Sequence, residues 1–207
     1  MLPFFLANVQ LLEHAFDAIL RMDDRERDNT MELFISSARD MPSMIYENSI
    51  THVLSVMSSD ELGYITVPSV IDRENWLKIE MDDVIHEDAY EAPRADQVQQ
   101  ILDWGRSLPS NARVLVHCYA GISRSTGAAL ALKVQEKGLD QLERCVDWLV
   151  DHRPIACPNP LVTKHADQIL GANGELHRAA EAVANSKLIK HFGQEWREIF
   201  NRDHIRE

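Results

Sequence analysis

The chain has 207 residues, of which 45% are hydrophobic and 26% are charged, and these values are ordinary for one globular domain. The net charge of −12 argues against a nucleic-acid-binding surface, because contact with a phosphate backbone needs clustered Lys and Arg side chains. Three cysteines, an odd number without metal-ligand spacing, favour a reducing compartment, so we expect a cytoplasmic protein with no metal ion or other cofactor.

The first 30 residues are predicted to form an amphipathic helix followed by a charged linker. Apolar side chains share a broad stripe over residues 1–20, and a mixed-charge run follows at 21–30. Polar residues interrupt the apolar part, and it lacks the basic start and the cleavage site of a secretory signal. No stretch of the chain predicts a membrane span. We expect a helical extension that either packs on the domain or serves in docking or dimerisation.

Alternating strand and helix patterns begin at Met31. The predicted elements are strands over 31–35, 51–57 and 77–81 and a short helix over 41–46. Such alternation is typical of an α/β fold, in which helices cover a central sheet. The third strand ends in Asp82-Asp83, and an acidic loop continues to Pro93.

A polar loop joins a predicted buried strand at 113–117 to a predicted buried helix after Arg124. The strand is rich in β-branched and apolar residues, and the helix is rich in small apolar residues and ends near Gly138. The backbone amides of the loop point at whatever lies on the N-terminus of the helix. The sequence therefore predicts an anion site in this loop.

Cysteine and arginine side chains bracket the loop, with five residues between Cys118 and Arg124. Unpaired amides, the positive helix end and a guanidinium all favour a thiolate, so Cys118 is predicted to be a nucleophile. Arg124 offers planar paired donors that match the oxygens of a phosphoryl group. Gly121 leaves room for the backbone to curl around the anion. Ser125 is placed to bond to the sulfur and help it depart.

Further helices are predicted on both sides of this region. They cover 98–108, 142–149 and 175–184, and an amphipathic stretch follows at 188–200. Arg153-Pro154 ends the second of these helices. We expect one domain over residues 31–171, with helical extensions at 1–30 and 172–207.

The string from His117-Cys118 to Arg124-Ser125 resembles the phosphate-binding loop of the cysteine-dependent protein tyrosine phosphatases. The run Ala-Gly-Ile-Ser-Arg-Ser at 120–125 is most similar to the dual-specificity branch, and the chain length is similar to that of small bacterial members. The resemblance implies a central mixed β-sheet flanked by helices. The string at 153–159 and the apolar stretch at 161–170, with Gly171 as a stop, resemble the last helices of this fold.

The resemblance also implies metal-free hydrolysis of a phosphate monoester through a phospho-cysteine intermediate, with a phosphoprotein or phosphopeptide as substrate. Cys118 attacks phosphorus, Ser125 assists the departure of sulfur, and His117 orients the loop and tunes the thiolate. The phosphoryl oxygens are held by the loop residues Tyr119, Ala120, Gly121, Ile122, Ser123 and Arg124.

An aspartate that closes the corresponding strand is the general acid and base of this family. Asp83, 35 positions before Cys118, matches it best, and Asp82 is the alternative. The acidic loop that follows them is longer than the simplest family members need, so both aspartates stay candidates.

Other functions are also open. A phosphatase for an inositol phosphate or a nucleotide is one, although the five uncharged residues of the loop favour a phosphoprotein. A sulfurtransferase or arsenate reductase also uses a cysteine loop, but Asp82-Asp83 and the downstream helices argue against it. A phosphoprotein-binding module without turnover is opposed by the intact Cys118, Arg124 and Ser125. The sequence pattern does not indicate whether the protein is a monomer or an oligomer.

Overall fold

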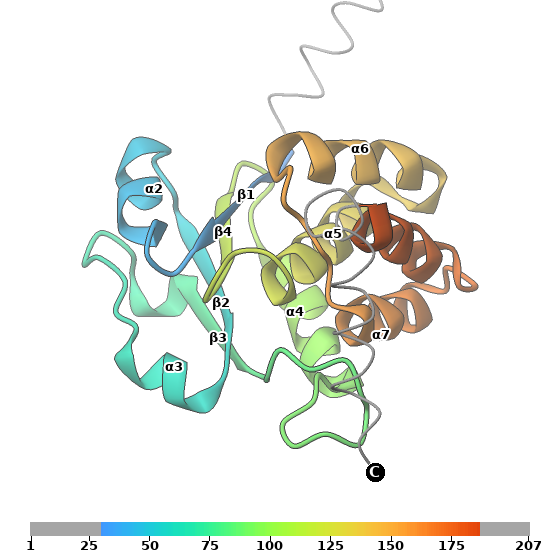
Figure 1. Ribbon diagram of the computed structural model, residues 1–207. Helices are drawn as coiled ribbons and strands as arrows, with labels where there is room; N and C mark the ends of the chain where they lie inside the picture. Colours follow the sequence, from blue (N-terminus) through green and yellow to red (C-terminus); the bar gives the residue numbers. More distant parts are fainter. Residues whose placement is uncertain (1–29, 187–207) are drawn as a thin grey trace, which may run out of the picture.

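The computed structural model describes residues 30–186 (Figure 1). The extension predicted over 1–30, apart from Thr30, and the amphipathic stretch predicted at 188–200 lie outside these residues. The strands are β1 (Glu32–Ser37), β2 (His52–Met57), β3 (Trp76–Glu80) and β4 (Arg113–Cys118). The helices are α2 (Met41–Glu47), α3 (Ser59–Tyr64), α4 (Ala95–Ser107), α5 (Arg124–Lys137), α6 (Leu142–His152) and α7 (Pro160–Leu170), with 3₁₀ turns η1 (Arg73–Asn75) and η2 (Leu139–Gln141).

The four strands form one sheet in the order β1-β4-β2-β3. The predicted α/β fold, with a central sheet flanked by helices, is confirmed. The sheet differs from the expected mixed one, since every neighbouring pair of the described strands is parallel. The reason is the connectivity, because a helix follows each of the first three strands before the next one begins, and such crossovers return the chain in the same direction.

Helices cover both faces of this sheet (Figure 1). Helix α2 packs against β1 and β4 on one face, and α4 and α5 pack on the other, with α6 and α7 outside them. Helix α5 is buried over most of its length, in agreement with its small apolar residues. The larger core lies between this helix and the sheet, where Val114, Val116 and Leu130 are fully buried. Helix α5 and its N-terminal loop are therefore held from several sides.

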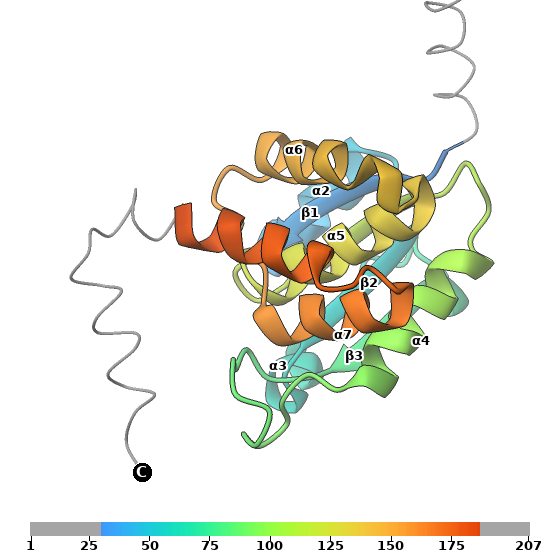
Figure 2. The same ribbon diagram turned by 90° about the vertical axis from the view of Figure 1, so that its right-hand side faces the viewer.

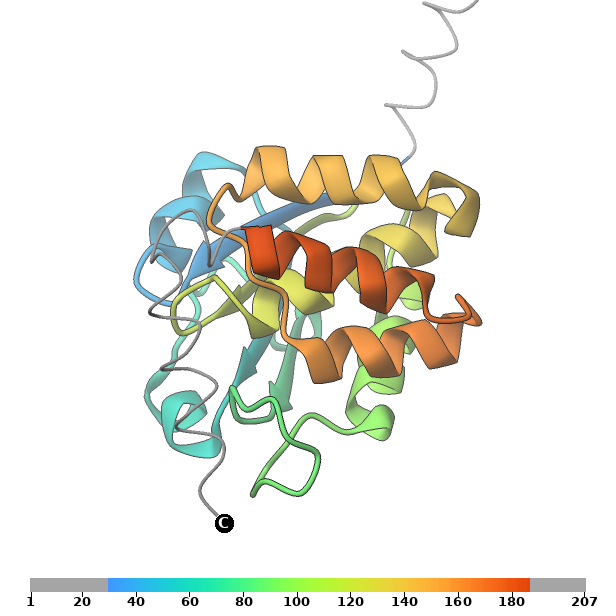
Figure 3. The same ribbon diagram turned by 45° about the vertical axis from the view of Figure 1, so that its right-hand side comes forward.

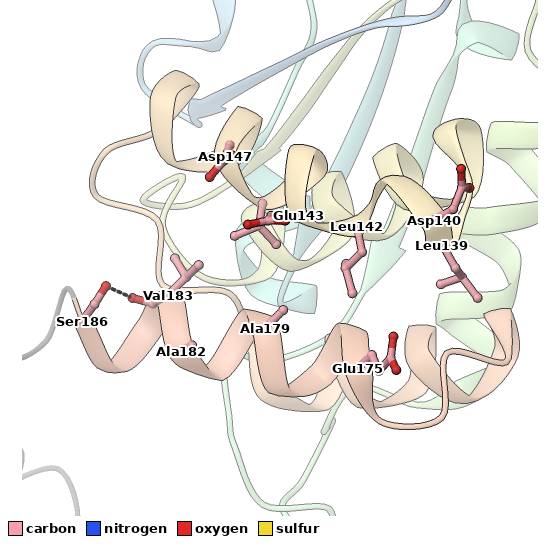
Figure 4. A pocket seen from close by; sticks show the side chains of 11 residues that line it. Leu139, Asp140, Leu142, Glu143, Asp147, Glu175, Ala179, Ala182, Val183 and Ser186 are labelled. Carbon is pink, nitrogen blue, oxygen red and sulfur yellow. Dashed lines mark hydrogen bonds between the residues drawn. The ribbon is translucent and has the colours of Figure 1, made fainter.

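The chain continues as a helix over residues 175–186, which lies between α6 and α7 (Figures 2 and 3). Leu176, Ala180 and Val183 of this segment are buried in the same core as α5. A groove of about 610 Å³ separates the segment from α6, with apolar side chains such as Leu142 and carboxylates such as Glu143 along its walls (Figure 4). The groove contains none of the predicted site residues.

The positions of the predicted strands and helices agree with the structure to within one to three residues at most ends. One described helix, α3, was missed. It has no buried residue, so it gives no apolar period, although Ser58 and Glu61 have the spacing of a capping box. Within residues 30–186, no helix is long and apolar enough to cross a membrane.

Candidate active site

Cys118 ends β4, and α5 begins at Arg124, so the loop between them lies at the carboxyl edge of the parallel sheet. Ligands of open α/β sheets usually bind at this edge. The Cys118 sulfur accepts a hydrogen bond from the Gly121 amide at 3.2 Å and lies 3.2 Å from the Ser125 hydroxyl. Both partners stabilise negative charge on sulfur, which is the form of cysteine that acts as a nucleophile.

The loop turns sharply at Gly121, where φ is +69°. A Cβ atom at this position would lie 2.5 Å from the carbonyl oxygen of Ser36 and 2.8 Å from Nη2 of Arg153. Ser36 belongs to β1, so the loop closes directly on the neighbouring strand. The close approach requires glycine and agrees with the tight curl predicted for this residue.

The carbonyl groups of the loop are held from outside by the connection from α6 to α7. Arg153 donates from Nε to the Gly121 carbonyl at 2.8 Å and from Nη2 to the Ala120 carbonyl at 3.1 Å. The backbone amides of Cys157 and Asn159 donate to the carbonyls of Ile122 and Ser123 at 2.9 Å and 3.2 Å. These contacts occupy the carbonyls of residues 120–123. An anion above the sulfur would therefore meet loop amides.

The side chain of Arg124 is buried beside this loop, with 5% of its surface exposed. Its Nη1 donates to Glu61 Oε2 and to the Met81 carbonyl, both at 3.0 Å. Its buried Nε has no hydrogen-bond partner among the described residues, and it lies 3.9 Å from Asp83 Oδ2. A buried donor of this kind is suited to a phosphoryl oxygen.

Glu61, from the missed helix α3, balances the charge of Arg124. Burial alone would raise the pKa of Glu61, but hydrogen bonds from Arg124 and Ser58 and the guanidinium charge lower the pKa on balance. The carboxylate is thus ionised at neutral pH and holds the guanidinium through Nη1.

The two candidate acids differ in their contacts. Asp83 Oδ1 accepts hydrogen bonds from the Ser123 hydroxyl at 2.5 Å and from Asn159 Nδ2 at 3.0 Å, so its carboxylate contacts the loop between β4 and α5. The Asp82 amide bonds to the Glu91 carbonyl at 2.8 Å. Burial and the Glu91 carboxylate raise the pKa of Asp82, against the effect of Arg124. The hydrogen bonds from the loop favour Asp83 as the acid.

His117 lies behind the cysteine and is fully buried. Its Nε2 is 2.6 Å from the Ser55 hydroxyl oxygen, which accepts a hydrogen bond from Trp76 Nε1 at 2.9 Å. Burial lowers the pKa of His117 to about 4, so the ring is neutral at pH 7. The Ser55 hydroxyl and Nε2 thus form a hydrogen bond between two neutral groups. His117 therefore carries no charge of its own next to Cys118.

The structure brings the predicted Cys118, Ser123, Arg124, Ser125 and Asp83 together. The predicted phosphate-binding residues Tyr119 and Ala120 are exposed, whereas Gly121 is buried and Ile122 is half-buried. Tyr119 has 65% of its surface exposed. The described residues contain no group of three or more His, Cys, Asp and Glu side chains that could bind a metal ion.

Sequence reasoning missed Glu61, Arg153 and Asn159, which contact the site from other elements. The capping-box spacing Ser58 to Glu61 was a signal for α3 but not for contact with Arg124. Asn159 precedes a proline and an apolar run, as a helix N-cap does, and this signal marks the start of α7. Neither signal reveals a role in the site.

Residues 33–169 match the family described as "Dual specificity phosphatase, catalytic domain". The chain belongs to this family. Dual specificity protein phosphatase 15 of Mus musculus is 28% identical over 135 residues, which cover 65% of this chain and 52% of that protein. The chain thus matches about half the length of this dual-specificity phosphatase.

Solved structures of similar proteins share the fold of this dual-specificity phosphatase family member. The human tyrosine phosphatase-like serine/threonine/tyrosine-interacting protein superimposes with a TM-score of 0.54 at 18% identity, over 68% of this chain and 92% of the other. DUSP15 superimposes with a TM-score of 0.50 at 24% identity, over 72% of this chain and 90% of the other. At 18% and 24% identity, the structural likeness establishes the fold alone.

Proposed function

We propose that this chain hydrolyses phosphate monoesters of phosphoproteins, phosphotyrosine above all, through a phospho-cysteine intermediate. The observation that carries the proposal is the convergence of three groups at one point. The Cys118 sulfur has the Gly121 amide and the Ser125 hydroxyl at 3.2 Å each, and Arg124 presents a buried donor at the same loop. Donors arranged in advance around a developing negative charge are the main source of catalysis in such sites.

In the first step, the Cys118 thiolate attacks phosphorus, so that a sulfur–phosphorus bond forms and the ester oxygen–phosphorus bond breaks. The departing oxygen takes a proton from the Asp83 carboxyl group. The equatorial oxygens are held by Arg124 and the loop amides, which bear the negative charge of the transition state.

In the second step, water attacks the phospho-cysteine. Asp83, now a carboxylate, takes a proton from this water. The sulfur–phosphorus bond breaks, inorganic phosphate leaves, and the Ser125 hydroxyl donates a hydrogen bond to the departing sulfur. Both the thiolate and the protonated acid are restored, and no metal ion or other cofactor takes part.

The surroundings of the loop favour a phosphoprotein over an inositol phosphate or a nucleotide. The five residues between Cys118 and Arg124 are uncharged, and the carboxylates of Glu61, Asp82 and Asp83 lie close to the guanidinium. A substrate with several phosphate groups would be repelled by these carboxylates. A single phosphate on a peptide avoids most of this repulsion.

The first test is hydrolysis of an aryl phosphate in the presence of EDTA by the wild type and by Cys118→Ser. We expect turnover in the wild type and none above background in the variant, because the serine hydroxyl is not ionised in this site. After an acid quench, the wild type should carry one phosphoryl group by intact-mass measurement.

The matched control is Cys145→Ala, since Cys145 is a buried thiol of α6 outside the loop, and we expect it to keep its turnover. Turnover by Cys118→Ser would refute the mechanism, and so would loss of wild-type turnover on addition of EDTA. A wild type that binds phosphopeptide without turnover would favour the binding module.

A further inference from the structure

Asn159 lies where three parts of the chain meet. They are the acid loop (residues 82–93), the phosphate loop (residues 118–124) and the start of α7. We infer that Asn159 is a positioning residue, which holds the Asp83 carboxyl group over the phosphate loop for proton transfer to the leaving group. The inference rests on the proposed function, because it assigns a role to the proposed acid.

The direction of the Asn159 amide is fixed by the helix that it caps. The side chain is fully buried, and its Oδ1 accepts hydrogen bonds from the amides of Leu161 and Val162 at 3.0 Å and 3.2 Å. An oxygen is required there, because both partners are donors. The Nδ2 group must therefore point to the other side.

On that side lies the acid loop. Nδ2 donates to Asp83 Oδ1 and to the Val84 carbonyl, both at 3.0 Å. One amide group thus contacts the carboxylate and the backbone of the next residue. Two bonds to adjacent positions of the loop restrict both the place and the orientation of the Asp83 side chain.

The backbone of Asn159 completes a closed set of contacts. Its amide donates to the Ser123 carbonyl at 3.2 Å, and the Ser123 hydroxyl donates to the same Asp83 oxygen at 2.5 Å. Asp83, Ser123 and Asn159 therefore contact one another in pairs. A shift of Asn159 would move the acid and the phosphate loop relative to each other.

The other contacts between the acid loop and α7 are weaker or more distant from the acid. Glu87 and Lys164 form an ion pair at 2.6 Å, with 56% and 43% of their side chains exposed. His165 Nε2 lies 3.0 Å from the Pro93 carbonyl, at the far end of the loop. Exposed ion pairs contribute little to stability. The Asp83 side chain is itself 41% exposed, so it needs a buried partner to hold it in place. Asn159 is thus the buried anchor next to the acid.

The test is the dependence of turnover on the leaving group in Asn159→Ser. Serine is a good N-cap, so α7 keeps its cap while Asp83 loses the Nδ2 donor. Phenyl phosphate has a poor leaving group and needs the acid, whereas 4-nitrophenyl phosphate needs it less. We expect kcat on phenyl phosphate to fall by about tenfold or more, with at most about a twofold fall on 4-nitrophenyl phosphate and a similar KM for both.

Two further variants complete the experiment. Asp83→Asn removes the acid altogether and should lower kcat on phenyl phosphate by about a hundredfold. Adding Asn159→Ser to Asp83→Asn should cause little further loss of rate on either substrate. Lys164→Gln removes the exposed ion pair from the same helix and loop, and it should keep the wild-type ratio of the two rates.

The ratio of the two rates does not depend on the fraction of folded protein, so reduced folding of a variant leaves the test valid. An equal fall on both substrates in Asn159→Ser would mean a merely structural role and would overturn the inference. An Asp83→Asn variant with no leaving-group dependence would instead remove Asp83 as the acid, and with it the proposed mechanism.

Discussion

Single side chains behind the candidate nucleophile form a buried chain of hydrogen bonds from Trp76 through Ser55 to His117. Ser55 and His117 lie opposite each other on the paired strands β2 and β4, so the sheet register brings them together. Both are fully buried. A neutral imidazole has one hydrogen bond here, from Nε2 to Ser55, and its buried Nδ1 has no partner among the described residues. An imidazolium would add an unpaired charge in the same buried place, which burial disfavours.

The buried His117 should make the stability of the protein depend on pH. Its pKa is lowered to about 4 from an ordinary 6.5, so between these values the unfolded chain binds a proton that the folded chain does not. The free energy of unfolding therefore falls as pH falls from about 6.5 to about 4, by about 3 kcal/mol over the whole range. Urea unfolding at pH 7 and pH 4.5 measures the change.

The control for this prediction is His117→Gln, which has no group that titrates at the same position. Carboxylates contribute to the pH dependence of both proteins, so the difference between the two slopes belongs to His117. Equal slopes in the wild type and the variant would contradict the prediction.

The residues of the loop itself could be predicted, because the spacing from Cys118 to Arg124 is local and the chemistry of each type is distinctive. The partners of these residues could not. Glu61 contacts Arg124 across 63 positions, and Asn159 contacts Asp83 across 76. Nothing in the local pattern around either residue indicates such a contact, since it depends on how the crossover helices pack.

At the scale of secondary-structure elements, the junction of β4 and α5 depends on the turn at Gly121. Gly121→Ala should destabilise the fold by about 1–3 kcal/mol and lower turnover by at least about tenfold. The reason is that the new Cβ would lie 2.5 Å from a backbone oxygen of β1, at a φ of +69°. Urea unfolding and aryl phosphate turnover measure the two effects.

Gly63→Ala in α3 is the matched control, because a Cβ at this position meets nothing within 4 Å. It should keep its turnover and gain up to about 1 kcal/mol of stability. If Gly121→Ala behaved like Gly63→Ala, the close approach of loop and strand would have no energetic role.

Elements with a buried apolar face were predictable, and α3 was not, for the same physical reason. The apolar period of a helix comes from packing, and α3 packs no buried residue against the sheet. The parallel sheet likewise depends on the crossover helices, one of which is α3. Apolar runs locate the strands in the sequence, but they do not specify their neighbours.

For the whole molecule, the helical segment 175–186 contributes to the main core, beyond the domain proposed over 31–171. Leu176→Ala should lower the free energy of unfolding by about 2–5 kcal/mol, because its side chain is fully buried. Asn185→Ala, on the exposed side of the same segment, should change it by less than about 0.5 kcal/mol. A small effect of Leu176→Ala would mean that the segment is separate from the domain.

The close contact of the phosphate loop with distant parts of the chain limits how far its motif can be transplanted. Gly121 closes on the end of β1, and the carbonyls of residues 120–123 depend on donors from the connection between α6 and α7. A graft of residues 118–124 onto a foreign strand–helix junction would transfer the sequence motif without the contacts that hold the loop in shape. A working graft would have to bring the end of β1 and the Arg153–Asn159 connection with it.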